Sequence, residues 1–159
     1  MDRRTPDPVG LYEPFVAAGP LVAVSAISSA QDGKLITGTV GREVDMPTAE
    51  EAAWRAARNL LAVIGDAVGG DLSRVRQVLM VRGHVNASPD FALVHQVIDP
   101  ASEVIVAKLG DRGRHARTAI GCSTLPNRNT VTLDALIMVE EPRGVSKNAC
   151  SARSMRPPE

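Results

Sequence analysis

Two charged side chains, Arg117 and Asp134, are the strongest candidates for chemistry in this sequence. Arg117 stands at the start of a short run of small and β-branched residues that is typical of a strand. A guanidinium stays protonated and presents a planar fork of donors that fits a carboxylate. The position therefore suits an anion-binding arginine. Two other interpretations stay open: a structural pair with Asp134, or a solvated side chain beside Arg114.

Asp134 lies within a second strand-like run, residues 130–139. Successive side chains of a strand point to opposite faces of the sheet. One face of this run is entirely apolar and holds Val131, Leu133, Ala135, Ile137 and Val139. Asp134 falls on the other face, and two of its neighbours on that face, Leu136 and Met138, are apolar. An acid with such neighbours is not on an ordinary water-exposed surface.

Other catalytic patterns receive little support. Three histidines without a compact cluster of His, Cys and Asp predict no metal site, and no phosphate-binding or dinucleotide-binding glycine motif is present. Ser25 and Ser28 have no obvious histidine and acid partners for nucleophilic catalysis. His95 lies on an expected helix, where a single histidine is typical of a surface or packing position. We therefore expect no metal site.

The elements that position these residues are expected in the order strand, strand, helix, strand, helix, strand, strand. The strands are expected at residues 21–25, 35–40, 75–85, 118–124 and 130–139, and the helices at 48–68 and 88–109. Thr48 and Glu51 form a capping-box pattern at the start of the first helix, and Gly69-Gly70 ends it. Ser88 is expected to cap the second helix. Pro100 should kink or restart that helix, because proline lacks an N–H donor.

The composition limits the class of protein. The 159 residues include 18 basic and 18 acidic side chains, so the chain fits one domain whose net charge attracts neither nucleic acid nor a membrane surface. Aromatic residues make up 3%, too few for the stacking platform of most single-strand RNA binders. No apolar run is long enough to span a bilayer, and two cysteines without a pairing motif or signal peptide predict a cytoplasmic location. We expect one domain at residues 11–141, between a flexible lead-in at 1–10 and a disordered tail at 142–159.

The order of elements and several short motifs resemble the Rid, or YjgF-like, family of reactive intermediate deaminases. The family's C-terminal signature is a P-A-R-S run, a leucine-proline turn and a strand with an E-A pair. In this chain the signature reads His115-Ala116-Arg117-Thr118, Leu125-Pro126 and Asp134-Ala135. The family's N-L-L-A-V-L helix, D-F helix start and V-F-V-S-G-Q strand correspond to residues 59–64, 90–91 and 22–27. The resemblance covers about residues 10 to 140.

The resemblance implies an α+β fold of the chorismate-mutase-like type, with a mixed six-stranded sheet and two helices on one face. It also implies a homotrimer whose sheets form a barrel-like core, with clefts between the subunits. Each cleft would take a reactive 2-imino or enamine acid, as in 2-iminobutanoate/2-iminopropanoate deaminases. Hydrolysis there would release a 2-keto acid and ammonia without a cofactor.

The resemblance further implies roles for individual residues. Arg117 would bind the substrate carboxylate, Asp134 would hold the attacking water, and the backbone carbonyl of Ala119 would orient that water. The remaining substrate-binding positions would be Tyr12, Ala26, Ile27 and His95. Ala26-Ile27 replaces the family's Gly-Gln, and His95 replaces its usual asparagine.

Two other functions stay open. A trimer that binds small carboxylates without catalysis, as a sensor or partner protein, would need Arg117 but not Asp134. An endoribonuclease, an activity attached to the family's name, would be at odds with zero net charge and few aromatic residues.

Overall fold

The computed structural model of the protein describes residues 10–140. One sheet holds its strands in the order β1-β2-β5-β3-β4. The strands are β1 (Phe15–Ala18), β2 (Leu21–Ser28), β3 (Val75–Asn86), β4 (Ala116–Cys122) and β5 (Val131–Val139). β3 and β4 run parallel and the other neighbouring pairs are antiparallel, so the sheet is mixed, as expected.

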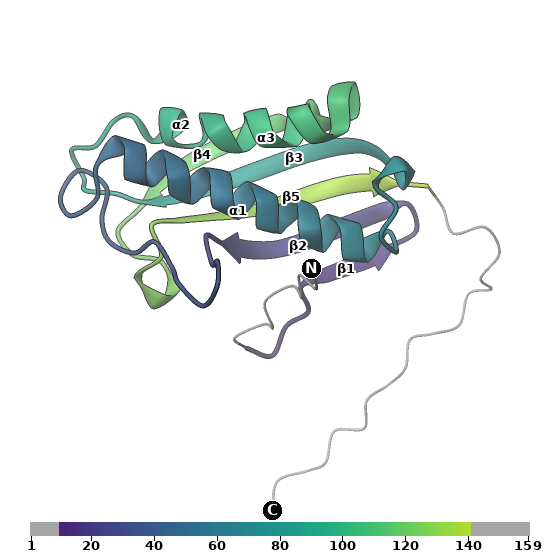
Figure 1. Ribbon diagram of the computed structural model, residues 1–159, viewed down its shortest axis with the longest axis horizontal. Coiled ribbons are helices and arrows are strands. Elements are labelled where there is room, and N and C mark those ends of the chain that lie inside the picture. The colour runs from purple at the N-terminus through teal and green to yellow at the C-terminus, as the bar shows by residue number, and fades with distance from the viewer. Residues whose placement is uncertain (1–9, 141–159) are drawn as a thin grey trace, which may run out of the picture.

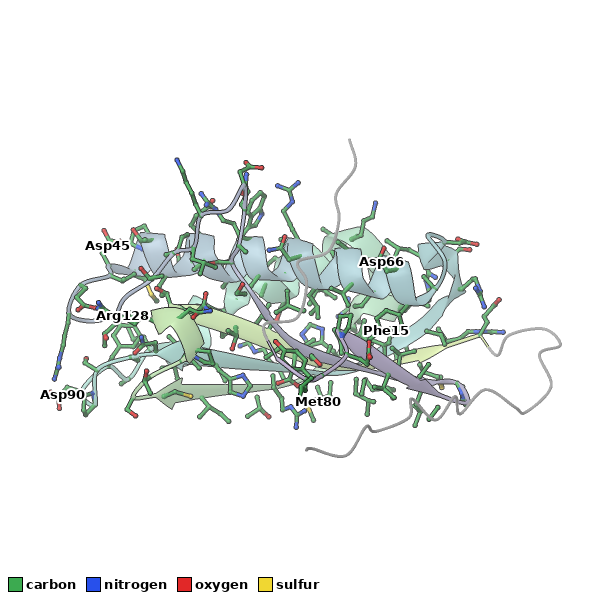
Figure 2. The ribbon with its side chains drawn as sticks, turned by 90° about the horizontal axis from the view of Figure 1, so that it is seen from below. Phe15, Asp45, Asp66, Met80, Asp90 and Arg128 are labelled. Carbon is green, nitrogen blue, oxygen red and sulfur yellow. The ribbon has the colours of Figure 1, made fainter. Side chains whose placement is uncertain are left out.

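Helices cover one face of this sheet. The α-helices are α1 (Met46–Ala67), α2 (Val94–Val97) and α3 (Asp99–Leu109), and short 3₁₀ helices occur at Leu72–Arg74, Gly110–Gly113 and Pro126–Arg128. The two long helices, α1 and α3, lie side by side across the sheet (Figure 1). Met80 projects from the opposite face, away from the helices (Figure 2). The architecture is therefore a two-layer α+β fold with two main helices on one face, which confirms the predicted fold class.

The number of strands differs from the prediction. Among the described residues the sheet has five strands, not six. The predicted strand at 35–40 is wrong, because Thr37 and Val40 form only isolated bridges. Gly38 interrupts the extended backbone there with a φ of +119°, and a Cβ at this glycine would lie 2.9 Å from Cγ2 of Val44. In its place β1, which the sequence pattern did not predict, pairs with β2 at the edge of the sheet.

α1 supplies much of the core. Asp45 caps this helix instead of Thr48, because its carboxylate accepts the Thr48 N–H at 3.0 Å. That hydrogen bond lowers the pKa of Asp45, since it favours the charged carboxylate. Small side chains allow the helix to lie close to the sheet, and five fully buried alanines provide them: Ala49, Ala52, Ala53, Ala56 and Ala57.

The predicted second helix is divided into two. Ser88 does not cap a helix: its N–H donates to the Val40 carbonyl at 2.9 Å, and α2 begins only at Val94. Pro100 lies in the first turn of α3, so the predicted restart at this proline is confirmed. The restart makes Asp99 the first residue of α3.

The sheet face opposite the helices is apolar over much of its area. As predicted, the residues of β5 alternate, with a buried inner set and an outer set in which Leu136 and Met138 are exposed. The strand register places the exposed Val16, Leu21 and Ile120 and the half-buried Met80 on the same outer face. We call this surface the open face and define it by Val16, Leu21, Met80, Ile120, Leu136 and Met138.

The ends of the chain were also part of the prediction. The expected tail at 142–159, and residues 1–9 of the expected lead-in, lie outside the described residues. The division into a lead-in, a domain at 11–141 and a tail stays a prediction.

Candidate functional site

Arg117 lies on the edge strand β4, on the side of the sheet that faces the helices. Its register partner on β3 is Val81, which is fully buried beneath the helix layer. Arg117 Nη1 donates to Asp99 Oδ1 at 2.8 Å and to Ser102 Oγ at 3.1 Å, both from the start of α3. The arginine side chain is only 25% exposed. Its partner is therefore Asp99, which the sequence analysis did not consider.

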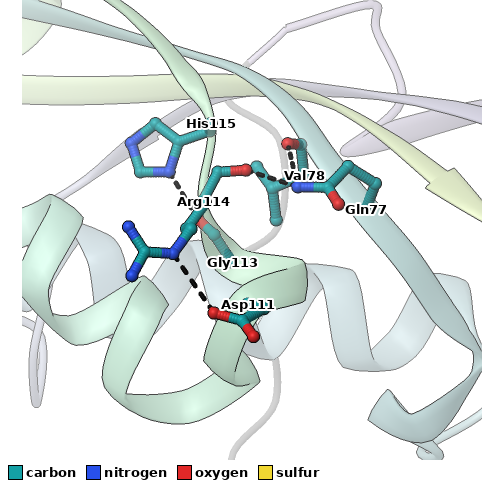
Figure 3. Close-up of polar contacts among 6 residues, drawn as sticks. All are labelled: Gln77, Val78, Asp111, Gly113, Arg114 and His115. Carbon is teal, nitrogen blue, oxygen red and sulfur yellow. Dashed lines mark hydrogen bonds and ion pairs between the residues drawn. The ribbon is translucent and has the colours of Figure 1, made fainter.

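His115 supports this arrangement from the start of β4. Its Nδ1 lies 2.6 Å from the Gly113 carbonyl, and its Nε2 lies 3.1 Å from Ser102 Oγ. The neighbouring turn is held as well: Arg114 pairs with Asp111 at 3.2 Å, and its carbonyl accepts a hydrogen bond from the side chain of Gln77 (Figure 3). A connected polar network thus fixes the segment that leads into Arg117.

Asp134 lies on the open face, near the middle of the sheet. Arg82 Nε on β3 donates to Asp134 Oδ1 at 2.7 Å, and His84 Nδ1 lies 3.8 Å from Asp134 Oδ2. The Asp134 side chain is only 13% exposed, whereas that of Arg82 is 59% exposed. Neither basic partner was predicted from the sequence. The alternation along β3 could have identified them, because Val81 and Val85 point inward and Arg82 and His84 between them point outward.

Ala26 and Ile27 lie next to Asp134 at an irregularity of the sheet. β2 pairs Val24 with Ala135 and Ile27 with Leu133, so Ser25 and Ala26 together face Asp134 in a β-bulge. Bulges are common next to active sites, where they redirect side chains. Ala26 is exposed, whereas Ile27 packs against the core.

Tyr12 belongs to the same region. The segment that follows it is tied to the bulge, because the Ser25 hydroxyl donates to the Glu13 carbonyl at 2.7 Å and the Ser25 N–H donates to the Pro14 carbonyl at 2.9 Å. The Tyr12 side chain itself is half exposed.

Ala119 and His95 lie on the other side, with Arg117. Ala119 is two residues beyond Arg117 on β4 and shares its helix-facing side. The Cys122 carbonyl accepts the Ala87 N–H at the end of β3. Backbone groups alternate in direction along a strand, so the Ala119 carbonyl points away from β3, to the outer edge of the sheet. His95 is exposed on α2, one helical turn before Asp99.

The candidate residues thus form two separate groups within one chain. The first group, at the β4 edge, consists of Arg117, Ala119 and His95; the second, around the β2 bulge, consists of Tyr12, Ala26, Ile27 and Asp134. Arg117 and Asp134 lie two strand spacings apart, about 10 Å, and on opposite faces of the sheet. One small molecule cannot contact both side chains in a single chain.

Residues 10–140 show neither a cluster of metal-binding side chains nor a membrane-spanning helix. In this range no three or more His, Cys, Asp and Glu side chains are grouped to hold a metal ion. The same range contains no helix that is long and apolar enough to cross a membrane.

Comparison with known proteins identifies relatives of this chain. The Trypanosoma cruzi protein TCP17 is 33% identical over 132 residues, which cover 82% of each protein. The crystal structure of Atu1372 from Agrobacterium tumefaciens, a protein of unknown function, is 41% identical, with a TM-score of 0.81 over 84% of this chain and 85% of that one. RidA from an Antarctic Psychrobacter species is 23% identical, with a TM-score of 0.59 over 86% of this chain and 100% of that one. No protein-family model matches the chain.

The chain therefore belongs to the family of TCP17 and Atu1372, and it shares the fold of the Rid/YjgF-like proteins. The shared fold is the one that the resemblance in the sequence motifs implied.

Proposed function

We propose that the protein is a cofactor-free, cytoplasmic deaminase that hydrolyses 2-imino or enamine acids at clefts between the subunits of a homotrimer. The observation that carries this proposal is the division of the candidate residues into two groups. In a cyclic trimer the β4-edge group of one subunit can meet the bulge group of its neighbour, because every interface of such a ring joins two different surfaces of the same chain. Arg117 of one subunit and Asp134 of the next then face one substrate.

The open face supports the assembly that this site requires. Monomeric proteins rarely expose a large continuous apolar surface, and the open face holds six apolar side chains on one side of the sheet, five of them exposed. A second and a third copy of the same chain would bury it. The sheets would then form the core of the trimer and the helices would lie outside.

The chemistry follows from the groups at such a cleft. Arg117 binds the carboxylate of the imino acid and so fixes the position of its C=N carbon. The outward carbonyl of Ala119 and the carboxylate of Asp134 accept the two hydrogens of a water molecule. The oxygen of this water forms a bond to the C=N carbon while Asp134 takes its proton. Asp134 returns this proton to the nitrogen, which gives a carbinolamine. Transfer of the hydroxyl hydrogen to the same nitrogen through Asp134 then breaks the C–N bond, so that ammonia leaves and the 2-keto acid remains.

The required rate enhancement is small. Imines hydrolyse in water without a catalyst, so the protein needs only to hold water and substrate in the right orientation. This demand suits a site without metal or cofactor. It also suits the small number of polar groups that the two halves contribute.

A second candidate function is binding of small carboxylates without catalysis. The 2.7 Å hydrogen bond from Arg82 Nε to Asp134 Oδ1 favours it, because this bond already uses one of the two carboxylate oxygens that could hold the water. Such a protein would use Arg117 as proposed but would leave the water unactivated.

The decisive experiment is a coupled assay of imine hydrolysis. An amino-acid oxidase generates imines from several amino acids, and semicarbazide traps the imine that escapes hydrolysis. The deaminase proposal predicts that the wild-type protein lowers trapped imine and that Arg117→Ala does not. No acceleration for any imine, together with retained carboxylate binding, would favour the second candidate.

Asp134→Asn separates the two functions within one experiment. A deaminase should lose turnover in this variant but keep its affinity for a carboxylate. Equal loss of turnover and affinity would contradict the role of Asp134 in holding water.

A further inference from the structure

The carboxylate site that the proposed function assigns to Arg117 already contacts a carboxylate of its own chain. Arg117 Nη1 donates to Asp99 Oδ1 at 2.8 Å and to Ser102 Oγ at 3.1 Å. Both contacts use Nη1, and the Nε and Nη2 side of the guanidinium makes none with the described residues. A bidentate ligand needs two adjacent N–H groups in a fork. Asp99 therefore competes with an incoming carboxylate for the charge of the guanidinium and, where the ligand also uses Nη1, for that donor.

Asp99 is placed to release the arginine at little cost. Its side chain is 52% exposed, and water weakens ion pairs of this type. It is also the first residue of α3, where the helix dipole favours a negative charge even when the arginine has left. Asp99 is therefore a weak and replaceable partner.

Ser102 accepts a hydrogen bond from Arg117, and His115 fixes the direction of the Ser102 hydroxyl. The Gly113 carbonyl can only accept, so the hydrogen of the neutral imidazole lies on Nδ1 and donates to that carbonyl at 2.6 Å. His115 Nε2 is then an acceptor and receives the hydroxyl hydrogen of Ser102 at 3.1 Å. The lone pairs of Ser102 Oγ stay directed at Arg117, whether or not Asp99 is in place.

We propose that Asp99 and Ser102 set the carboxylate affinity of Arg117 in opposite directions. Asp99 is an internal carboxylate that competes with the substrate carboxylate for the guanidinium, and Ser102, oriented by His115, is a positioning residue that keeps the guanidinium in register. This inference rests on the proposed function for the choice of Arg117 as the binding group, but not on catalysis. The ligand class it implies is the small 2-keto or 2-imino monocarboxylate.

The test measures binding and turnover separately in the full-length protein. Pyruvate is titrated calorimetrically into wild type and variants, and imine hydrolysis is measured in parallel. Asp99→Asn is compared with Glu103→Gln, which removes the same charge one turn further along α3, where the exposed Glu103 has no ion pair with any described residue. We expect the Kd for pyruvate to be about two- to five-fold lower in Asp99→Asn than in Glu103→Gln, the range set by weak exposed pairs.

Ser102 is tested by removal and rescue. Ser102→Ala should raise the Kd about ten-fold, as expected for one hydrogen bond to a charged group, and Ser102→Thr should restore most of the affinity because it keeps the hydroxyl. The same variants should change KM more than kcat. Thermal unfolding of each variant shows whether it is folded before it is titrated.

The possible results separate the two proposals. A Kd in Asp99→Asn equal to or above that in Glu103→Gln would overturn the role of Asp99, and a failure of Ser102→Thr to rescue would overturn that of Ser102. The expected binding changes without imine turnover would support this inference and contradict the deaminase. Absence of pyruvate binding in all the proteins would overturn the inference itself.

Discussion

Mixed trimers test whether the site is divided between subunits. Arg117→Ala removes the carboxylate-binding group, and Asp134→Asn removes the group that holds the water. In a homotrimer of either variant, each of the three proposed clefts lacks one of these groups. Both homotrimers should therefore lose most of their deaminase activity.

A mixed trimer that contains both variants should recover a fixed fraction of the wild-type deaminase activity. Arg117 and Asp134 lie on opposite faces of the sheet and on strands separated by β3, so each cleft takes them from different subunits. In a trimer with two subunits of one variant and one of the other, one of the three interfaces joins an intact Arg117 to an intact Asp134. The recovered rate should be about one third of the wild-type rate per trimer, which is the fraction of intact interfaces.

The assay requires two affinity tags. The variants are co-expressed with different tags, mixed trimers are isolated by two successive affinity steps, and trapping of imine by semicarbazide reports turnover. The matched control is Arg117→Ala co-expressed with itself under both tags, which has no intact interface. Mixed trimers that remain as inactive as this control would refute the divided site, because a site within one chain is never restored by mixing.

Three further predictions concern the fold and the interface. Gly83→Ala should destabilise the protein by about 1–3 kcal/mol, because its Cβ would lie 2.6 Å from Cδ1 of Ile98. Gly65→Ala in α1 has open space around the new Cβ and should be neutral or stabilising. Equal urea midpoints of the two variants would contradict this. Leu136→Glu on the open face should dissociate the trimer in sedimentation experiments, while Leu35→Glu, at the same 36% exposure outside the sheet, should not; a trimer in both would argue against the open face as interface. The pKa of Asp45 is lowered in the folded protein by its hydrogen bond at the start of α1, so its contribution to stability is present above its usual pKa near 3.8 and is lost as the pH falls through the lower folded value. Asp45→Asn keeps a capping oxygen but does not titrate, so its unfolding midpoint should fall less than that of the wild type below about pH 4; parallel pH curves would contradict the assignment.

Much of the fold was predictable because the spacing of apolar residues along the sequence matches the side chains that are buried in the structure. The alanine-rich face of α1 and the alternation of β5 directly reflect which side chains the core excludes from water. Pro100 marks a helix restart because the missing N–H acts locally. The false strand at 35–40 had the right apolar composition, but Gly38 adopts a backbone conformation that ends pairing. β1 is short and lies at the edge, so its pattern carries little signal.

The candidate site was less accessible to sequence analysis. Arg117 could be chosen from its residue type and position, and Asp134 from its apolar neighbours. Their partners depend on contacts between distant segments: Asp99 meets Arg117 across 18 residues, and Arg82 meets Asp134 across 52. Arg117 and Asp134 lie on opposite faces of the sheet. This follows only from the register of β4, β3 and β5, which no local sequence pattern predicts.

A crystal structure with bound pyruvate would test the central claim most directly. The account predicts that the pyruvate carboxylate lies on the guanidinium of Arg117 in a cleft between two subunits. Asp99 should be displaced from its 2.8 Å contact, and Asp134 of the neighbouring subunit should lie within reach of one bridging water. Pyruvate bound away from Arg117, or in a pocket closed by a single chain, would contradict the account.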